Sequence, residues 1–395
     1  MTNKKHFLRL FGLLIATIVG TVAVHDLLPR ENQRLENVLK RVASLNDQLD
    51  FGTEFITSDT KNSTKVIFAD VFGEIKKPTY KGFIATLDDS VGSDAILVLE
   101  PYVPLSDEEM EILADKYVEA IPEFNTVELD QDVELEGESY EQNVLPEPAT
   151  QAVAPAKTVR VAVLDSGIDK DHAVFAHTSL QSGWNTVDEN SDLSDDIGHG
   201  THIAGIISLN SSNVEIVPYK VVGKNGGRLS DVLKALQRAM DDKVEVVNMS
   251  FGFSKGSAAL QDVLDDLDKE GVTFIAAAGN KNSSAPFYPA HYDDVIAVAA
   301  TDVYGNKLPK SNFGDWVDVA AYGNNIYSAA PGQKYQRMSG TSQATAMVTA
   351  KFVDYLQKNS NGAEAFQERL AGFLDLYSKP IEKGSLKGMS FISSL

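Results

Sequence analysis

The spacing of apolar and polar positions changes along the chain near residue 158. Before it, short alternating stretches are typical of strands, and one stretch with helical spacing begins at a capping box, Ser106-Asp107-Glu108-Glu109, and ends before Pro122. A small α+β domain is therefore expected here. Its predicted strands are Val66–Phe68, Tyr80–Leu87, Ala95–Leu99 and Asn125–Val133, and a separate amphipathic helix is expected at Glu31–Leu49.

From Thr158 on, near-continuous apolar runs alternate with helical patterns. Such runs are typical of parallel strands covered on both faces, and the alternation predicts an α/β fold with a doubly wound, mostly parallel sheet and helices on both faces. Functional residues are then expected just after the carboxyl ends of the strands. The predicted strands are Val159–Leu164, Val214–Val222, Val244–Met249, Val272–Ala278 and Val295–Ala299, with helices at Ser230–Asp241 and Ser257–Lys269.

Between the two patterns lies a stretch rich in Glu and Pro, from Glu134 to Lys157. It offers little to bury, and its prolines favour an extended chain, so we interpret it as an exposed linker that proteases could cut. The expected organisation is a signal peptide or anchor at 1–28, a small domain at 29–138, a linker at 139–157 and a main domain at 158–395.

The N-terminus resembles an export signal. Lys4, Lys5 and Arg9 precede an apolar run from Leu10 to Val24, and Thr21-Val22-Ala23 is an acceptable cleavage site. These 15 residues are few for a spanning helix, which needs about 20. We expect a cleaved signal and a secreted protein; an uncleaved signal, acting as an anchor, is the alternative.

Charge and composition narrow the classes of partner. A net charge of −21 argues against nucleic acids and anionic membrane surfaces, which reward clustered Lys and Arg. The chain has no cysteine, so neither disulfides nor thiolate metal sites are expected.

Polar residues with chemical potential follow several predicted strands or begin helices. Asp165 ends the first strand, where an Asx turn is the alternative. His199 lies between two glycines, and His202, three residues on, is expected to be structural rather than a metal ligand. Asn280 follows Ala277-Ala278-Gly279. Ser342 lies at the start of a helix, where it is either an N-cap candidate or a nucleophile next to free backbone N–H groups.

The order Asp, His, Asn, Ser and the sequences around these residues resemble those of the subtilisin-like serine proteases, the subtilase or S8 family. The resemblance covers about 158–395. It is carried by Val163-Leu164-Asp165-Ser166-Gly167, Gly198-His199-Gly200-Thr201-His202, Ala278-Gly279-Asn280 and Gly340-Thr341-Ser342. A weaker resemblance to a subtilase propeptide, an inhibitor and folding chaperone, covers about 55–138.

The resemblance implies a role for each of these residues. Ser342 would attack the scissile carbonyl, His199 would act as general base, and Asp165 would orient the imidazole. Asn280 would form the oxyanion hole with the Ser342 backbone N–H. Substrate would bind along Ser250, Phe251, Gly252, Ala277, Ala278, Gly279 and Lys281, with no metal in the site.

The sequence departs from the family pattern in two places. Gln343, Ala346 and Met347 stand where the family usually has Met and then a Pro-His pair. The segment from Ala204 to Pro218 is short, so the calcium loop of many secreted relatives is not predicted. No cofactor is expected to be required, and calcium elsewhere is left open.

These features predict a secreted serine endopeptidase, made as a self-cleaving zymogen and active as a monomer. Its partners would be a peptide or protein substrate and its own propeptide, and a membrane only if the signal stays uncut. A Lys281 cation would favour an acidic residue before the cut bond, and Glu134, Glu136 and Glu138 offer such a site. The alternative is that Lys281 points into water.

Three functions remain open within this family. One is a dedicated processing protease, such as those that remove lantibiotic leader peptides. The others are a general extracellular degradative protease and an inactive binding module on the same fold. The last would need a lost triad member, and Asp165, His199 and Ser342 are all present.

Overall fold

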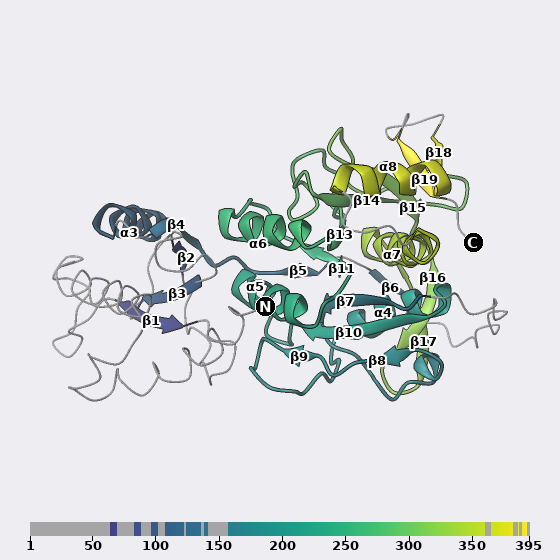
Figure 1. Ribbon diagram of the computed structural model, residues 1–395, viewed down its shortest axis with the longest axis horizontal. Helices are drawn as coiled ribbons and strands as arrows, with labels where there is room; N and C mark the ends of the chain where they lie inside the picture. Colours follow the sequence, from purple (N-terminus) through teal and green to yellow (C-terminus); the bar gives the residue numbers. More distant parts are fainter. Residues whose placement is uncertain are drawn as a thin grey trace. The chain divides into compact units, whose positions relative to one another are not determined.

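The computed structural model describes residues 64–68, 83–87, 96–101, 107–121, 124–135, 138–140, 157–359, 365–381, 386 and 389–392 (Figure 1). It divides the chain into two compact units, one ending at Gln131 and the other beginning at Asp132. The predicted signal at 1–28 and the predicted helix Glu31–Leu49 lie outside the described residues.

The N-terminal unit contains a four-stranded antiparallel sheet in the order β1-β3-β2-β4. Tyr117 of its helix lies edge-to-face with Phe83 and Phe124, with ring centroids 6.1 and 6.5 Å away, so aromatic packing joins helix and sheet. The elements follow the predicted pattern. They are β1 (Thr64–Phe68), β2 (Phe83–Leu87), β3 (Ile96–Pro101), α3 (Asp107–Ala120) and β4 (Phe124–Leu129).

The second unit is built on a ten-stranded sheet whose central six strands are all parallel, in the order β15-β14-β13-β11-β7-β10. The five predicted strands and the mostly parallel α/β fold are confirmed. The central strands are β7 (Val159–Asp165), β10 (Val214–Lys220), β11 (Val246–Met249), β13 (Thr273–Ala277), β14 (Val295–Thr301) and β15 (Val319–Tyr322). At the edges lie β8 (Ser179–Leu180), β9 (Trp184–Asn185), β18 (Ser378–Pro380) and β19 (Ser390–Ile392).

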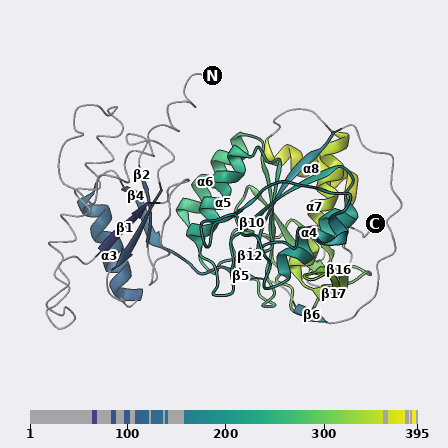
Figure 2. The same cartoon turned by 90° about the horizontal axis from the view of Figure 1, so that it is seen from below.

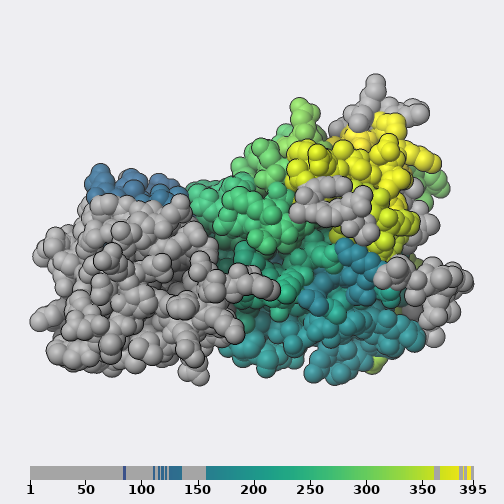
Figure 3. Space-filling view, in the orientation of Figure 1, coloured from purple at the N-terminus to yellow at the C-terminus, as the bar shows by residue number. Residues whose placement is uncertain are grey.

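Helices cover both faces of this sheet (Figure 2). On one face lie α4 (His199–Asn210), α7 (Thr341–Lys358) and α8 (Phe366–Tyr377), and on the other α5 (Leu229–Asp241) and α6 (Ala258–Lys269). The C-terminal residues, including α8, form part of the molecular surface (yellow in Figure 3). None of the helices in the described part of the chain combines the length and apolar character needed to cross a membrane.

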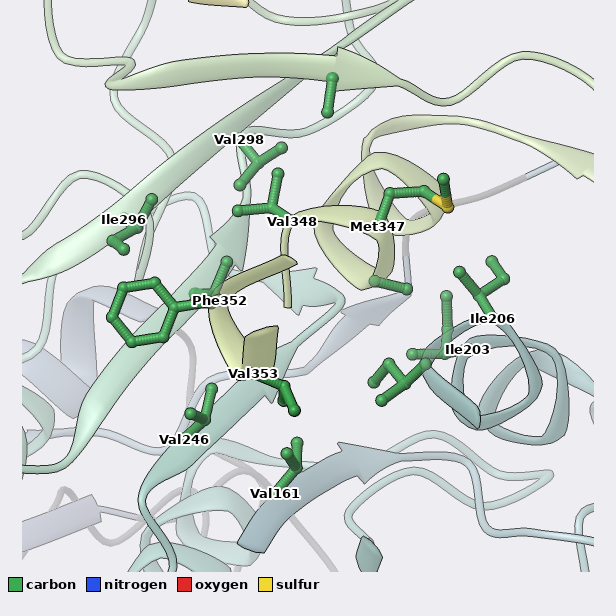
Figure 4. Packing of buried hydrophobic residues seen from close by; sticks show 14 of the residues in the cluster. Val161, Ile203, Ile206, Val246, Ile296, Val298, Met347, Val348, Phe352 and Val353 are labelled. Carbon is green, nitrogen blue, oxygen red and sulfur yellow. The ribbon is translucent and has the colours of Figure 1, made fainter. Parts of the chain in front are cut away.

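The core of this unit is organised around α7. Met347, Val348, Phe352 and Val353 of α7 lie among aliphatic side chains of the sheet and of α4 (Figure 4). All four are buried, and so are nearly all residues in the first three turns of the helix. This burial of apolar surface fixes α7, and with it Ser342 near its start.

The direction of winding changes at β7. The chain passes from β7 to β10 on one side, then returns across β7 to β11 and continues outward through β13 and β14. Crevices form beyond the carboxyl ends of strands at such a switch point. Asp165 ends β7, Ser250 follows β11 and Asn280 lies just beyond β13, so three predicted site residues lie at this edge.

The expectation of an exposed linker from Glu134 onward is wrong for residues 134–135 and 138–140, which form two short strands. Strand β5 (Glu134–Leu135) pairs antiparallel with β12 (Phe251–Gly252), and β6 (Glu138–Tyr140) pairs antiparallel with β17 (Lys334–Ser339). Strand β17 in turn pairs with β16 (Ile326–Ala330). Backbone groups make these ladders, so a segment with few apolar side chains still forms strands where an open edge is available.

Candidate active site

Asp165 and His199 form a buried pair. His199 begins α4, and its Nδ1 lies 2.8 and 2.9 Å from the two carboxylate oxygens of Asp165 at the end of β7. The two side chains are only 4% and 1% exposed. A carboxylate accepting from Nδ1–H leaves Nε2 as the basic nitrogen, so the pair fixes the tautomer that a general base needs.

Asp195, which the sequence analysis did not single out, holds the two segments that carry this pair. Its carboxylate accepts from Ser166 Oγ at 2.8 Å and from the Gly198 backbone N–H at 2.8 Å. It also accepts from the backbone N–H and the hydroxyl of Thr201, at 2.7 and 2.6 Å. An acidic residue shortly before a helix start was the available signal, because helix N-termini attract carboxylates.

Gly200 allows the close approach of these segments. A Cβ atom added at Gly200 would lie 2.2 Å from the Gly167 carbonyl oxygen and 3.1 Å from the Asp165 Cβ. Any side chain there would push α4 away from the end of β7. The glycine after His199 is thus required by the contact that brings His199 to Asp165.

His202 does not take part in this arrangement. Its side chain is buried, and its Nε2 lies 3.3 Å from the Gln336 carbonyl oxygen. Burial, with a smaller contribution from the nearby His199, lowers the pKa of His202 to about 3. The imidazole therefore stays neutral, which agrees with the structural role expected of it.

Ser342 is the second residue of α7, and its Oγ donates to the Ser250 carbonyl oxygen at 3.0 Å. Ser250 Oγ donates to the Ser342 carbonyl oxygen at 3.3 Å and accepts from Asn248 Nδ2 at 3.0 Å. Thr349, two turns along α7, donates to Asn248 Oδ1 at 2.9 Å. These bonds tie the start of α7 to the end of β11. Helices α4 and α7 also pack against each other.

Asn280 presents an amide donor next to the start of α7. Its Oδ1 accepts the Thr341 backbone N–H at 3.1 Å, which orients the side chain. Its Nδ2 is buried and has no hydrogen-bond partner among the described residues. A buried donor without a partner costs free energy, so this group is set to receive an oxygen from a ligand.

Phe287, which the sequence analysis did not single out, lies between the two glycine segments that were predicted to bind substrate. A Cβ added at Gly252 would lie 2.3 Å from the Phe287 ring, and one at Gly279 would lie 3.0 Å from it. The ring therefore fills the space between the two glycine segments. Phe251 packs its side chain edge-to-face on Phe253, at a centroid distance of 6.0 Å. No local pattern marked Phe287, because its role depends on two distant glycines. Ala277 and Ala278, also predicted to bind substrate, are buried.

Lys281 lies near Phe287. Its ammonium pairs with the carboxylate of Glu134 in β5 and lies 5.8 Å from the centroid of the Phe287 ring. Its side chain is 56% exposed. The cation predicted to face a substrate thus faces a segment of the same chain.

The positions that depart from the family pattern lie within a regular helix, because α7 runs without a break from Thr341 to Lys358. Gln343 is buried, and neither its amide nitrogen nor its amide oxygen has a partner among the described residues. An added Cβ at Gly340 would lie 3.3 Å from Gln343 Oε1 and 3.0 Å from Asn280 Nδ2, so both amides flank Gly340.

Comparison with known proteins places these residues in a family. The Subtilase family model matches residues 156–370, more than half of the chain. A thermophilic serine proteinase of Bacillus sp. strain AK1 is 33% identical over 264 residues, which are 64% of this chain and 66% of that protein. Thermitase of Thermoactinomyces vulgaris is 35% identical over 212 residues, 51% of this chain and 76% of thermitase.

Two further similarities are to an extracellular protease and to a solved structure. The minor extracellular protease Epr of Bacillus subtilis strain 168 is 34% identical over 222 residues, 53% of this chain and 34% of Epr. The crystal structure of a cold-adapted subtilisin-like serine proteinase matches with a TM-score of 0.56 and 30% identity, covering 65% of this chain and 95% of the other. The chain belongs to the subtilase family, and its second unit is a subtilisin-like serine protease domain.

Proposed function

We propose that this protein is a secreted serine endopeptidase that uses Ser342, His199 and Asp165 as its catalytic triad. The observation that carries the proposal is the buried Asp165–His199 pair, held at 2.8 Å at the start of α4 while Ser342 lies at the start of the adjacent α7. Ser342 Oγ attacks the substrate carbonyl and passes its proton to His199 Nε2. Asp165 stabilises the resulting imidazolium.

Asn280 Nδ2 and the Ser342 backbone N–H stabilise the oxyanion of the tetrahedral intermediate. The support is the amide that Thr341 orients, whose Nδ2 has no partner among the described residues. When the intermediate collapses, His199 returns the proton to the leaving amine. Water then hydrolyses the acyl-enzyme by the same steps in reverse order.

The test is hydrolysis of casein by the purified protein and its Ser342→Ala variant. We expect the variant to lose roughly 10⁶-fold in kcat, the size of effect known for removal of the nucleophile in subtilisin. Ser179→Ala, an exposed serine in β8, is the matched control and should keep full activity. Equal casein hydrolysis by Ser342→Ala and wild type would refute the assignment.

We also propose that the enzyme is made as a zymogen and matures by cutting its own chain. Support comes from the segment of the chain paired along β12 and from extracellular relatives such as Epr. The intact mass of the precursor, compared with that of Ser342→Ala, tests this. A shortened wild type with a full-length variant is expected; shortening of both would exclude Ser342 as the maturation nucleophile.

An acidic residue before the cut bond is the preference we propose, as suits a dedicated processing protease such as one that removes lantibiotic leaders. General extracellular degradation is the second candidate, and the similarity to the minor extracellular protease Epr supports it. Two peptides that differ only in Glu or Leu at that position separate the candidates. Faster cleavage of the Leu peptide would reject the acidic preference.

A further inference from the structure

Asn280 belongs to a short loop that follows β13, residues 278–283, which we call the oxyanion loop. A second segment, residues 307–313 between β14 and β15, bonds to this loop, and we call it the supporting loop. The Thr341 N–H holds the Oδ1 of Asn280. The place of the Asn280 amide as a whole depends on the backbone of the oxyanion loop, and so on what fixes that backbone.

Asn312 of the supporting loop bonds to the backbone on both sides of Asn280. Its Nδ2 donates to the Ala278 carbonyl oxygen at 2.8 Å. Its Oδ1 accepts from the backbone N–H groups of Lys281 and Ser283, both at 3.0 Å. One side-chain amide therefore holds the oxyanion loop before and after the residue that carries the proposed oxyanion donor.

Gly279, which precedes Asn280, is held at both of its backbone groups. Its N–H donates to Thr341 Oγ1 at 3.2 Å, and its carbonyl oxygen accepts from the Asn312 N–H at 2.8 Å. Its φ is +100°, a conformation that favours glycine, and an added Cβ would lie 2.5 Å from Asn312 Nδ2. The glycine is therefore required by the close approach of Asn312 to this loop.

The position of Asn312 is itself fixed by the central sheet. Asn312 is buried, and the Oγ of the preceding residue, Ser311, donates to the Asn312 carbonyl oxygen at 3.0 Å. The same Oγ accepts from the Ala300 N–H of β14 at 2.9 Å. The geometry of β14 is thus passed on to Asn312 and from Asn312 to the oxyanion loop.

Lys307 ties the two loops together through a charged donor. Its ammonium donates to the backbone carbonyl oxygens of Leu308, at 2.9 Å, and Ser311, at 2.7 Å, within the supporting loop. It also donates to Asn282 Oδ1 of the oxyanion loop at 2.8 Å. Hydrogen bonds from an ammonium are stronger than those from a neutral donor, so they hold both loops in one arrangement.

We infer that Asn312 is a positioning residue for catalysis, which fixes the oxyanion loop so that Asn280 Nδ2 meets the oxyanion of the reacting carbonyl. The inference rests on the proposed function and adds a residue to it. Oxyanion donors act by being in place before the reaction, and a misplacement of about 1 Å can cost about 10²-fold in rate. The bonds of Asn312 supply that fixed placement, while Asn280 Nδ2 itself has no partner among the described residues.

A double-mutant cycle with Asn280→Ala tests whether Asn312 acts through Asn280. We expect Asn312→Ala to lower kcat for a chromogenic peptide by about 10–100-fold, with KM changed by less than about threefold. In the Asn280→Ala background the same substitution should lower kcat by less than about threefold, because the donor that Asn312 positions is already missing. Equal losses of kcat in the two backgrounds would overturn the inference.

Asn185→Ala is the matched control for the loss of a buried amide. Asn185 is buried, its Oδ1 accepts from two backbone N–H groups at 3.0 and 3.1 Å, and its Nδ2 donates to the Asp192 carbonyl oxygen at 2.9 Å. Any loss of kcat that this variant causes should be the same with and without Asn280→Ala. A loss that disappears in the Asn280→Ala background, as expected for Asn312→Ala, would show that the cycle reports general destabilisation and would overturn the inference.

A measurement without catalysis checks the positioning directly. In the Ser342→Ala background, hydrogen exchange should become faster in peptides from the oxyanion loop when Asn312 is replaced by Ala, and should stay unchanged in peptides from α4. Unchanged exchange in the oxyanion loop would overturn the inference. If Asn312→Ala does not fold, Asn312→Asp takes its place in both experiments, because it keeps an oxygen for the N–H groups of Lys281 and Ser283.

Two reference proteins keep this inference distinct from the proposed function. Absence of casein hydrolysis by the wild type would refute the proposed function, and an unchanged kcat in Asn280→Ala would refute the oxyanion donor and with it the role of Asn312. Hydrolysis by the wild type, a large loss in Asn280→Ala and equal losses for Asn312→Ala in both backgrounds would refute the role of Asn312 alone.

Discussion

The two sides of the candidate active site differ in how their buried polar groups are partnered. Around His199, the carboxylate of Asp195 accepts five hydrogen bonds from Ser166, Ile197, Gly198 and Thr201. Around Ser342, the Asn280 Nδ2 and both amide atoms of Gln343 are buried without a partner in the described part of the chain. The Asp195 carboxylate is fully hydrogen-bonded in the absence of substrate, whereas the amides of Asn280 and Gln343 keep hydrogen-bonding capacity unused in the described structure.

The difference separates two tasks that a protease site must perform. The base must hold one orientation, which a satisfied network of buried bonds provides. In the proposed mechanism, Asn280 Nδ2 binds a charge that exists only during the reaction, which agrees with its lack of a partner among the described residues of the resting protein. Substitution of Asn280 should therefore change the rate more than the stability, and substitutions on the histidine side should change both.

Among substitutions that leave the proposed triad intact, the largest effect is expected for Asn280→Ala. Loss of the Nδ2 donor should lower kcat by about 10²–10³-fold with little change in KM, the range known for the equivalent donor of subtilisin. The melting temperature should change little, because the only bond lost from the described protein is the one to Thr341. Steady-state kinetics with a chromogenic peptide measures this, and a loss below tenfold would contradict the role of Asn280.

Asp195→Asn should have the largest effect on stability. The amide keeps one acceptor oxygen where the carboxylate has two, so at least one buried donor loses its partner and the unfolding free energy should fall by about 2–4 kcal/mol. Catalytic activity should also fall, because Asp195 holds the start of α4 through the backbone N–H groups of Gly198 and Thr201.

Asp266→Asn is the control, because the Asp266 side chain is 47% exposed and pairs with the exposed Lys269 at 2.8 Å. It should cost at most about 1 kcal/mol. Urea unfolding of both variants in the Ser342→Ala background avoids self-digestion. Equal losses of unfolding free energy for the two substitutions would show that the hydrogen bonds around Asp195 contribute no more to stability than an exposed ion pair does.

Much of this site could be predicted from the sequence, because it lies in short local motifs. Asp165, His199, Asn280 and Ser342 each occur at the end of an apolar run or at a helix start, and the parallel sheet brings those ends together. Helices α5 and α6 begin within one residue of their predicted starts. Periodicity and capping residues are enough for such elements.

What the sequence did not predict depends on contacts between distant segments. The Phe287 ring occupies the space left by Gly252 and Gly279, which belong to two other segments of the chain. The Asp195 carboxylate accepts hydrogen bonds from donors on two separate segments. Strands β5 and β6 form by backbone pairing with edges elsewhere in the chain. The composition of this segment indicated a linker. The pattern of hydrophobic residues does not show which strand elsewhere in the chain has an unpaired edge, so it could not predict this pairing.

The buried carboxylate of Asp318 is intermediate between Asp195 and the unpartnered amides, because it accepts one hydrogen bond from the described residues, from the Ala297 N–H at 2.8 Å. Burial raises the pKa of Asp318 from 3.8 to about 6. The folded state then holds the proton more tightly than the unfolded state. Stability should therefore fall as the pH rises from about 4 to about 6, by up to ~3 kcal/mol.

The pH dependence of unfolding in the Ser342→Ala background tests this, with Asp318→Asn as the comparison. The variant should lose that part of the dependence, so the difference in stability between the two proteins should grow in its favour from pH 4 to pH 6. A constant difference across this range would mean that Asp318 ionises with an ordinary pKa and that one donor suffices for it.

The smallest effect, and the most informative about the serine side, is expected for Gln343→Met. The substitution removes two buried polar atoms that have no partner among the described residues, so the unfolding free energy should rise by about 1–2 kcal/mol. Gln357→Met is the matched control on the same helix, because Gln357 Nε2 is hydrogen-bonded to the Ser212 carbonyl oxygen and its loss should bring no gain.

The kcat/KM of the Gln343→Met variant then shows whether the unpartnered Gln343 amide contributes to catalysis. If kcat/KM falls while stability rises, the Gln343 amide contributes to binding the reacting group alongside Asn280, next to Gly340. If the unfolding free energy rises while kcat/KM stays unchanged, the Gln343 amide has no part in catalysis. Asn280 is then the one amide of the two that contributes to the reaction. A loss of stability would contradict the comparison itself, because it would show that the buried Gln343 amide is satisfied in the folded protein.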